Sequence, residues 1–240
     1  MAIEVGHVEA IFRYPVKSMA GERLEVAEVG WHGLEGDRRL ALRRVGYLGG
    51  MPWLTAGKLA DLVRFVPFGG EDGELPTHVR TPEGSELAVY GEELAAEVGG
   101  RFGAPVEMMR LDQGIFDVTS MSVMSCSTVA EVGRLAGVGE EVRRFRPNLL
   151  VRLANPTSFG EDAWVGGVLA FGDGVDAPAM AVTMRDVRCA MVNLDPDTAA
   201  STPEVLRSVV RANGKTAGVY GTVLRVGRLE VGQTIYLHVG

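Results

Sequence analysis

Cys189 has the most versatile chemistry of the side chains in this sequence. It stands in the stretch V-R-C-A-M-V-N-L-D-P-D-T-A, after a β-branched and apolar run and beside Arg188. A thiolate is both a nucleophile and a soft metal ligand, and a neighbouring cation favours that ionised form. A free cysteine is more often a small buried core residue. The rest of the chain decides between these two interpretations.

Three other short segments carry a cation beside hydroxyl or amide groups. They are Y-P-V-K-S with Lys17 and Ser18, G-D-R-R with Arg38, and F-R-P-N with Arg146 and Asn148. The planar guanidinium of Arg146 suits a phosphate or a conjugated ring, and Pro147 excludes the helical conformation for the residue before it. Each cation alone would be a solvated or structural charge. Together with Arg188 they predict a positive pocket around one thiolate, which suits a phosphorylated cofactor whose metal is bound by sulfur.

The composition bounds the class of protein. The 240 residues allow one large or two small domains, and a formal net charge of −7 argues against a general nucleic-acid surface. Cys126 and Cys189 are the two cysteines, so neither a disulfide framework nor a cysteine-rich zinc or iron–sulfur site is expected. The N-terminus has no basic region before its apolar residues, and no run approaches the length of a membrane span. These features predict a cytoplasmic protein with no membrane partner.

The elements that must position these side chains are mainly strands. Short β-branched runs bounded by Gly, Pro or Asp are typical of barrels and sandwiches. They fall at 8–12, 24–29, 39–42, 63–66, 106–111, 148–153, 168–171, 179–184 and 222–226, and the chain end predicts two or three strands. The stretch 69–83 predicts a surface loop, and the break at 99–105 predicts two domains, residues 1–103 and 104–240.

Three helices are expected among these strands. An apolar repeat every four residues predicts the first helix around 94–102. A capping box that begins at Thr128 predicts a second helix to about Gly137. Thr202 as N-cap predicts a third helix that ends at Gly214. Its expected buried face consists of Leu206, Val209 and Val210.

The order of the segments resembles the MOSC family, the domain named after the C-terminal part of molybdenum cofactor sulfurase. Y-P-V-K-S, F-R-P-N-L-L-V, E-D-A-W-V-G and R-C-A-M-V-N-L-D-P-D-T follow one another as in that family. Within it, the chain is most similar to the subgroup that includes the mitochondrial amidoxime-reducing component. The resemblance covers essentially the whole chain. It implies a mainly β protein with a few helices (α+β), in which a MOSC-type β-barrel is preceded by a smaller β-rich N-terminal domain.

The resemblance also implies a molybdenum-molybdopterin cofactor. Cys189 matches the cysteine that ligates molybdenum, so it is the expected metal ligand and catalytic residue. The positions that match cofactor-binding residues are Lys17, Ser18, Arg38, Thr119, Ser120, Arg146 and Asn148. Arg188 is included with two interpretations, since it either keeps Cys189 ionised beside the cofactor or closes a salt bridge. The family's D-T-S-like stretch has its acid one residue early here, at Asp117, which is therefore left unassigned.

Two expected absences narrow the function. We expect no pyridoxal-phosphate domain of the kind found in a full molybdenum cofactor sulfurase, and two cysteines cannot ligate an iron–sulfur cluster. The resemblance then implies an oxidoreductase that reduces small N-hydroxylated or N-oxide substrates at a cysteine-ligated molybdenum. Its electrons would come from a separate flavin reductase, haem protein or iron–sulfur protein. The alternative is a sulfur or cofactor carrier that uses a Cys189 persulfide or the cofactor pocket.

Overall fold

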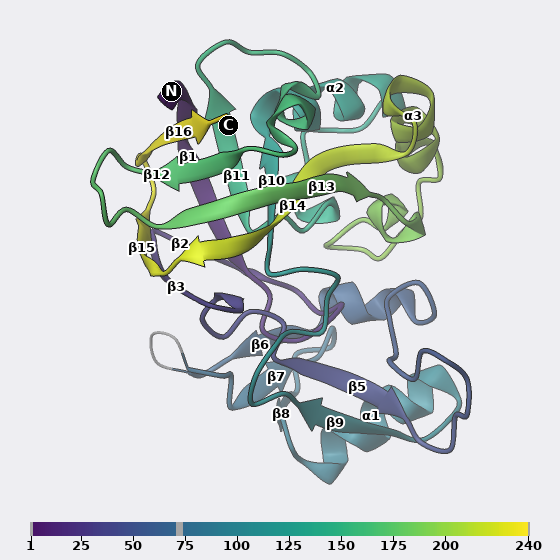
Figure 1. The fold of residues 1–240 in the computed structure, drawn as a ribbon. Coiled ribbons are helices and arrows are strands. Elements are labelled where there is room, and N and C mark those ends of the chain that lie inside the picture. Colours follow the sequence, from purple (N-terminus) through teal and green to yellow (C-terminus); the bar gives the residue numbers. More distant parts are fainter. Residues whose placement is uncertain (1, 71–73, 240) are drawn as a thin grey trace.

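A closed barrel of seven strands forms the upper part of the computed structural model, which describes residues 2–70 and 74–239 (Figure 1). Neighbouring strands pair in the order β11-β10-β14-β13-β12-β16-β1, and β1 pairs back to β11 to close the ring. All of these pairs are antiparallel except β10 with β11. The bounds are β1 Ala2–Arg13, β10 Met121–Ser125, β11 Leu149–Leu153, β12 Val168–Phe171, β13 Ala179–Val187, β14 Thr216–Arg225 and β16 Thr234–His238.

The first strand closes the barrel because it pairs along both of its edges. Strand β1 pairs with β16 along its first half and with β11 along its second, and a register shift interrupts each pairing. Gly6 lies at this change of partner with φ +148°, and a Cβ there would lie 2.0 Å from the carbonyl oxygen of Arg152. Only glycine allows the two backbones to approach so closely. Since Ala2 pairs with His238, the two chain ends lie together (Figure 1).

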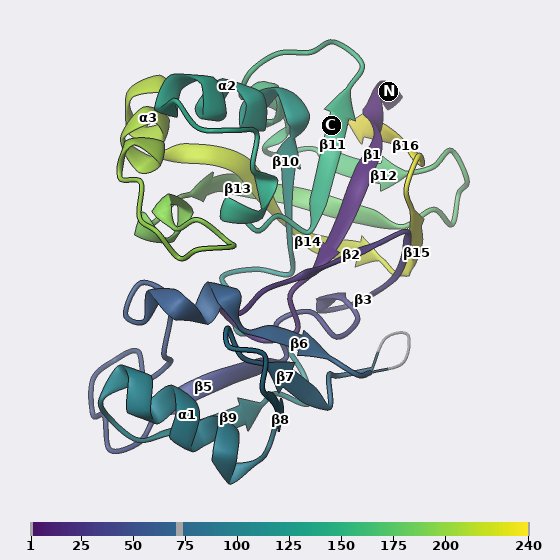
Figure 2. The same cartoon turned by 180° about the vertical axis from the view of Figure 1, so that it is seen from behind.

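Two helices cover one side of the barrel (Figure 2). They are α2 Cys126–Ala136 and α3 Glu204–Asn213. Three short 3-10 turns lie beside the barrel as well: η2 Val142–Arg144, η3 Gly160–Trp164 and η4 Ala190–Asn193. The helices pack on each other and on the barrel through Val129, Val132, Val205 and Val209. Both end at a glycine in the left-handed conformation, Gly137 and Gly214, as predicted.

The predicted starts of these two helices were wrong. Ser125, not Thr128, caps α2, because its hydroxyl accepts the Thr128 backbone N–H and the Thr128 hydroxyl is bound to the buried Glu161. Helix α3 begins at Glu204 after Pro203, without a side-chain cap. Its buried apolar residues are Val205 and the predicted Val209, whereas the predicted Val210 is half exposed.

The second region, here called the lower module from its place in Figure 1, contains two small sheets and one helix. Its elements are β5 Leu40–Arg44, η1 Ala60–Arg64, β6 Val66–Phe68, β7 His78–Arg80, β8 Glu86–Ala88, α1 Glu92–Phe102 and β9 Val106–Arg110. The apolar side of α1 packs Leu94 and Val98 into a core with Leu42, Leu62 and Phe65. Four further short strands lie beside the barrel, and β3, β4 and β15 contribute to its core: β2 Glu22–Leu24, β3 Val26–Gly30, β4 Gly33–Leu34 and β15 Gly227–Glu230.

The predicted fold class is confirmed, since the chain is mainly β with three α-helices in the described residues and a barrel. The predicted strand at 63–66 was wrong, because 60–64 form η1 and β6 starts only at Val66. The predicted loop at 69–83 contains strand β7, although residues 71–73 lie outside the described residues. The two-domain division at 103/104 stays a prediction. Four strand pairings cross it: β1 with β11, β1 with β16, β3 with β15, and β5 with β9. No helix in the described part of the chain is long and apolar enough to cross a membrane.

Candidate functional site

The predicted site residues come together where the barrel faces the lower module (Figure 1). The chain crosses between the two regions after β1 and again before β10, and these crossings carry Lys17 and Asp117. Two barrel loops, 144–148 and 188–190, reach the same place. Side chains connect them, because Arg38 donates to the carbonyl of Arg146 at 2.8 Å and Arg188 donates to the carbonyl of Phe145 at 2.7 Å.

Arg38 is the hub of this arrangement. Its side chain is almost fully buried and pairs with Asp37 at 2.5 Å and with Asp117 at 2.8 Å. It also lies 3.3 Å from the amide oxygen of Asn148. Burial alone would lower the pKa of Arg38, but the two carboxylates outweigh it and raise that pKa. Burial would likewise raise the pKa of Asp117, but the cations Arg38 and Lys17 hold it below its usual range. The unassigned acid of the sequence is therefore a partner of the predicted cations.

Tyr14 separates two buried guanidinium groups. Arg146 lies over its ring with the guanidinium carbon 4.1 Å from the centroid, and Arg38 lies 5.0 Å from the same centroid. Arg146 donates to the carbonyl of Met19 at 2.5 Å, but its Nη2 is buried without a hydrogen-bond partner among the described residues. No carboxylate in residues 2–70 and 74–239 lies within ion-pair distance of it. Burial therefore lowers the pKa of Arg146 to about 10.

Lys17 and Cys189 lie within electrostatic reach of each other. The ammonium of Lys17 donates to the carbonyl of Phe116 at 2.5 Å. Burial lowers the pKa of Lys17, whereas the charges of Asp117 and Cys189 act to raise it. The thiol of Cys189 is exposed, at the residue that precedes η4. The interpretation of Cys189 as a buried core residue is therefore wrong, and its thiol is free to meet a ligand.

Arg188 points away from the neighbouring thiol into the barrel wall. Its guanidinium donates to the carbonyls of Ala217 and Phe145, each at 2.7 Å, and pairs with Asp186 at 2.8 Å. It forms the salt bridge that was one of its two predicted roles, and its assignment to the cofactor stays a prediction. Burial raises the pKa of Asp186 to about 6 despite this pairing.

Three of the predicted residues have well-defined structural partners. Asn148 is buried and its amide oxygen accepts the backbone N–H of Ser122 at 3.0 Å. Thr119 donates to the carbonyl of Gly221 at 3.0 Å. The carbonyl of Ser120 packs against Gly33, where a Cβ would lie 2.1 Å from it. These contacts fix the barrel wall beside the cations.

The backbone is strained at three of the predicted cofactor residues. Ser18, Arg38 and Arg146 have φ of +69°, +47° and +53°. In the described residues, only three other non-glycine residues have positive φ: Phe159, Ala199 and Lys215. The left-handed conformation costs a residue with a Cβ on the order of 1–2 kcal/mol, so such residues persist where the surroundings impose the conformation, and they concentrate at functional sites. Arg146 is outside the right-handed helical region, as Pro147 predicted.

The sequence analysis did not single out Tyr14, Asp37 or Asp186. Asp37 accepts the backbone N–H of Tyr14 at 2.7 Å and is completely buried. The G-D-R-R motif held a signal for it, because an acid next to an arginine in a buried turn must be neutralised. Asp186 had no local signal, since only the fold turns it towards Arg188.

Comparison with known proteins identifies the family of this chain. The MOSC domain pattern matches residues 117–236, which are 120 of the 240 residues. The chain belongs to the MOSC domain family. This family is associated with the molybdenum cofactor. The matched part includes Asp117, Arg146, Asn148 and Cys189, while Lys17 and Arg38 precede it. Neither the amidoxime-reducing subgroup nor the N-terminal region is identified by this match.

Two solved structures are similar to this chain. The YUAD protein from Bacillus subtilis is 14% identical with a TM-score of 0.55, and the alignment covers 100% of this chain and 98% of that one. YiiM from Geobacillus stearothermophilus is 16% identical with a TM-score of 0.39, over 50% of this chain and 54% of that one. The first likeness shows that the fold extends over the lower module as well as the barrel. No curated protein matches the chain.

The residues fit a cofactor that combines a phosphate with a sulfur-ligated metal. The buried Nη2 of Arg146 has no partner, and burial depresses the pKa of both Arg146 and Lys17, so an anion beside them would stabilise both. In the described part of the chain, no three His, Cys, Asp or Glu side chains form a metal cluster. Cys189 would thus offer a single thiol, which suits a metal whose remaining ligands belong to the cofactor.

Proposed function

We propose that this MOSC protein binds a molybdenum-molybdopterin cofactor and acts as a reductase of small N-hydroxylated or N-oxide substrates. The observation that carries the proposal is the meeting of the exposed Cys189 with Lys17, Arg38 and Arg146 at one end of the barrel. The chain as a whole is acidic, so this local excess of cations is specific to the site. The choice of substrate rests on the resemblance to the amidoxime-reducing subgroup, which the segment Y-P-V-K-S carries in the N-terminal half of the chain.

The residues of the chain have separate tasks in this proposal. Cys189 offers its sulfur to the metal, and Lys17 and Arg146 hold the anionic phosphate and the ring of the cofactor. Arg38 keeps the loop of Arg146 in place through the carbonyl bond and orients Asp117 and Asn148. Asp117 holds its negative charge beside Lys17, which keeps that ammonium protonated. When bound, the cofactor supplies a molybdenum centre that exchanges electrons and an oxygen atom with the substrate.

The proposal includes a separate electron donor. The sequence holds no G-x-G-x-x-G motif for a flavin or nicotinamide and too few cysteines for an iron–sulfur cluster. A flavin reductase, a haem protein or an iron–sulfur protein would therefore deliver electrons to the site. Turnover with NADH and the purified chain alone would contradict this part of the proposal.

The deciding experiment compares two cysteine variants made in a host with intact cofactor synthesis. Cys189→Ala should lose molybdenum and pterin, while its thermal midpoint stays unchanged because the side chain is exposed. Cys126→Ala is the matched control and should keep both, since that cysteine lies half-buried at the start of α2. Metal and pterin content per chain are measured. Equal molybdenum in Cys189→Ala and the unmodified protein would reject the proposal.

The exposure of Cys189 favours a second candidate function. An exposed thiol can carry sulfur as a persulfide and pass it to an acceptor, which a buried one cannot. In that case the metal-free protein would release sulfur as thiocyanate on treatment with cyanide, and Cys189→Ala would not. Full molybdenum loading with no releasable sulfur would instead favour the reductase.

A further inference from the structure

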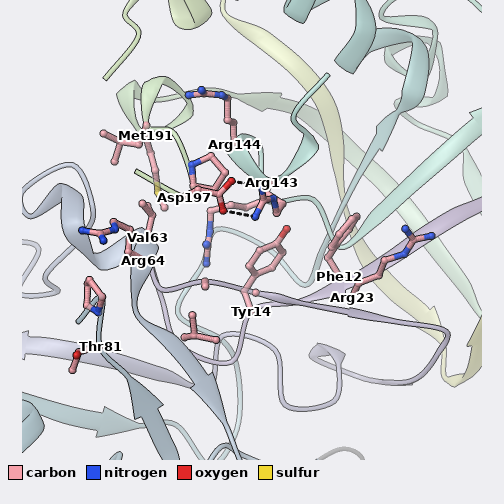
Figure 3. Close-up of a pocket in the computed structure, with 17 residues that line it drawn as sticks. Phe12, Tyr14, Arg23, Val63, Arg64, Thr81, Arg143, Arg144, Met191 and Asp197 are labelled. Carbon is pink, nitrogen blue, oxygen red and sulfur yellow. Dashed lines mark hydrogen bonds and ion pairs between the residues drawn. The ribbon is translucent and has the colours of Figure 1, made fainter. Parts of the chain in front are cut away.

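A cavity of about 450 Å³ lies between the barrel and the lower module, beside the site described above (Figure 3). Tyr14 and Arg146 form part of its wall, together with residues from η1, η2 and η4. Lys17, Arg38 and Cys189 do not line it. The cavity is therefore a separate space that shares only the Tyr14–Arg146 side with the predicted cofactor residues.

The walls of this cavity are rich in arginine. Five arginines line it against one acid, Asp197: they are Arg23, Arg64, Arg143, Arg144 and Arg146. Asp197 is already engaged, because it pairs with Arg143 at 2.7 Å, as the dashed lines of Figure 3 show. Arg144 pairs with Asp195 at 2.8 Å. Arg23 is exposed and has no carboxylate within ion-pair distance in the described part of the chain. Arg64 pairs with Asp61 at 3.6 Å. Arg23 and Arg146 are thus the lining arginines without a carboxylate partner among the described residues, and they leave the wall positively charged.

Three buried polar atoms of the lining have no hydrogen-bond partner among the described residues. They are Tyr14 Oη, Arg144 Nε and Arg146 Nη2. Tyr14 and Arg144 are only 2% and 8% exposed, and the hydroxyl of Tyr14 points towards the Arg143–Asp197 side of the cavity in Figure 3. All three atoms can donate a hydrogen bond, and an unsatisfied buried donor is costly. Arg146 also belongs to the proposed cofactor site, so Tyr14 Oη and Arg144 Nε carry the argument for this cavity, and an acceptor bound in it would satisfy both.

The remaining walls are apolar. Phe12, Val63, Met191 and Leu194 lie around the same space. A lone inorganic anion would leave these side chains against water, whereas an organic anion would cover them. We propose that this cavity binds a small organic anion, with a phosphate or carboxylate group at the unpartnered donors and a hydrocarbon part against Phe12 and Met191. The planar guanidinium groups suit either oxyanion.

The proposal does not depend on a cofactor at Cys189, because the two sites differ in all of their residues except the shared wall. Arg23 and Arg64 belong to the cavity alone and are not buried, so they can be changed without breaking a core contact. Arg152 and Arg228 are exposed arginines that do not line the cavity, and they provide a control with the same change of net charge.

The experiment is a calorimetric titration of the full chain with phenyl phosphate, benzoate and phenol at fixed ionic strength. Phenyl phosphate or benzoate should bind at one saturable site, and phenol should not. Arg23→Gln/Arg64→Gln should weaken binding about tenfold or more, because it removes two positive charges from the wall of the cavity. Arg152→Gln/Arg228→Gln should bind like the unmodified protein, and Cys189→Ala should as well.

Three results would overturn the proposal. Absence of binding by both anions would mean that water fills the cavity. Equal weakening in the two double variants would mean that general charge, and not this cavity, attracts the anion. Loss of binding in Cys189→Ala would assign the anion to the cofactor site instead, a result that leaves the proposed function standing.

Discussion

Arg38 and Arg146 lie on the same tyrosine ring, yet they are held in opposite ways. Arg38 is paired with two carboxylates, and these partners raise its pKa. Arg146 has a carbonyl partner, one unpartnered nitrogen and a pKa lowered to about 10 by burial. A buried charge with internal partners belongs to the folded structure, whereas a buried charge without them indicates a missing ligand. Arg38 therefore has a structural role at the site, whereas Arg146 is available to bind a ligand.

The largest expected effect is that of Arg38→Ala on stability. The variant leaves Asp37 fully buried and removes its strongest partner, so the free energy of unfolding should fall by about 3–5 kcal/mol. Urea unfolding followed by circular dichroism measures this loss. Arg228→Ala, which removes an exposed pair, should change the same quantity by less than about 0.5 kcal/mol. Similar losses for both variants would show that the buried ion pair of Arg38 contributes no more to stability than an exposed one.

Asp186, the carboxylate partner of Arg188, is buried, and burial raises its pKa to about 6. The folded pKa lies above the unfolded one, so the folded protein binds the extra proton between about pH 4 and 6. The stability contributed by this proton is fully present below pH 4 and is lost as the pH rises through 6. The measured quantity is the free energy of unfolding of Asp186→Asn minus that of the unmodified protein. This difference should be about 2–3 kcal/mol more positive at pH 7 than at pH 4. Parallel pH profiles of unfolding free energy would contradict this sign.

Arg146→Ala tests the arginine that has no carboxylate partner. Because it removes a charge without a carboxylate partner, its stability loss should stay below about 1.5 kcal/mol, well under that of Arg38→Ala. Its pterin affinity should fall at least tenfold, or about 1.5–3 kcal/mol, and Lys17→Ala should behave alike. Lys58→Ala is the control, since Lys58 is exposed on the lower module. Cofactor titration at fixed ionic strength measures all three, and an equal loss for Lys58→Ala would mean that no defined pocket exists.

The strands that the sequence predicted are those with continuous apolar runs. Val168–Phe171 and Leu149–Leu153 fall within predicted runs and are barrel strands. Strand β10 was missed because M-S-V-M-S has serines at its second and fifth positions, which is neither a continuous apolar run nor a regular alternation, although all five residues are buried. Its burial comes from β11, β14 and the helices around it, which no local pattern encodes. Local propensity thus predicted most of the strands and left a barrel or a sandwich open, whereas the barrel was what the resemblance to the MOSC family implied.

The candidate site shows the same limit. The cations and Cys189 were found because their residue types stand out in short motifs. The contacts between them were not predicted, because Asn148 reaches Arg38 across 110 residues and Arg38 reaches the Arg146 carbonyl across 108. Glu161, which is fully buried and holds Ser125 and Thr128, was missed for the same reason. A sequence motif can therefore name the reactive group, but not the groups that neutralise or orient it.

The smallest expected effect concerns the strained turn beside these residues. Ser18 and Ser208 are both buried, but Ser18 has φ +69° and Ser208 lies inside α3. In Ser18→Gly, the relief of roughly 1–2 kcal/mol of strain offsets the extra chain entropy of glycine, so stability should change by less than about 1 kcal/mol. Ser208→Gly relieves no strain and should lose about 1 kcal/mol. Urea unfolding of both variants measures the difference. An equal loss would show that the backbone at Ser18 is not strained, and it would leave the paired and unpaired arginines as the remaining sign that this part of the fold is shaped for a ligand.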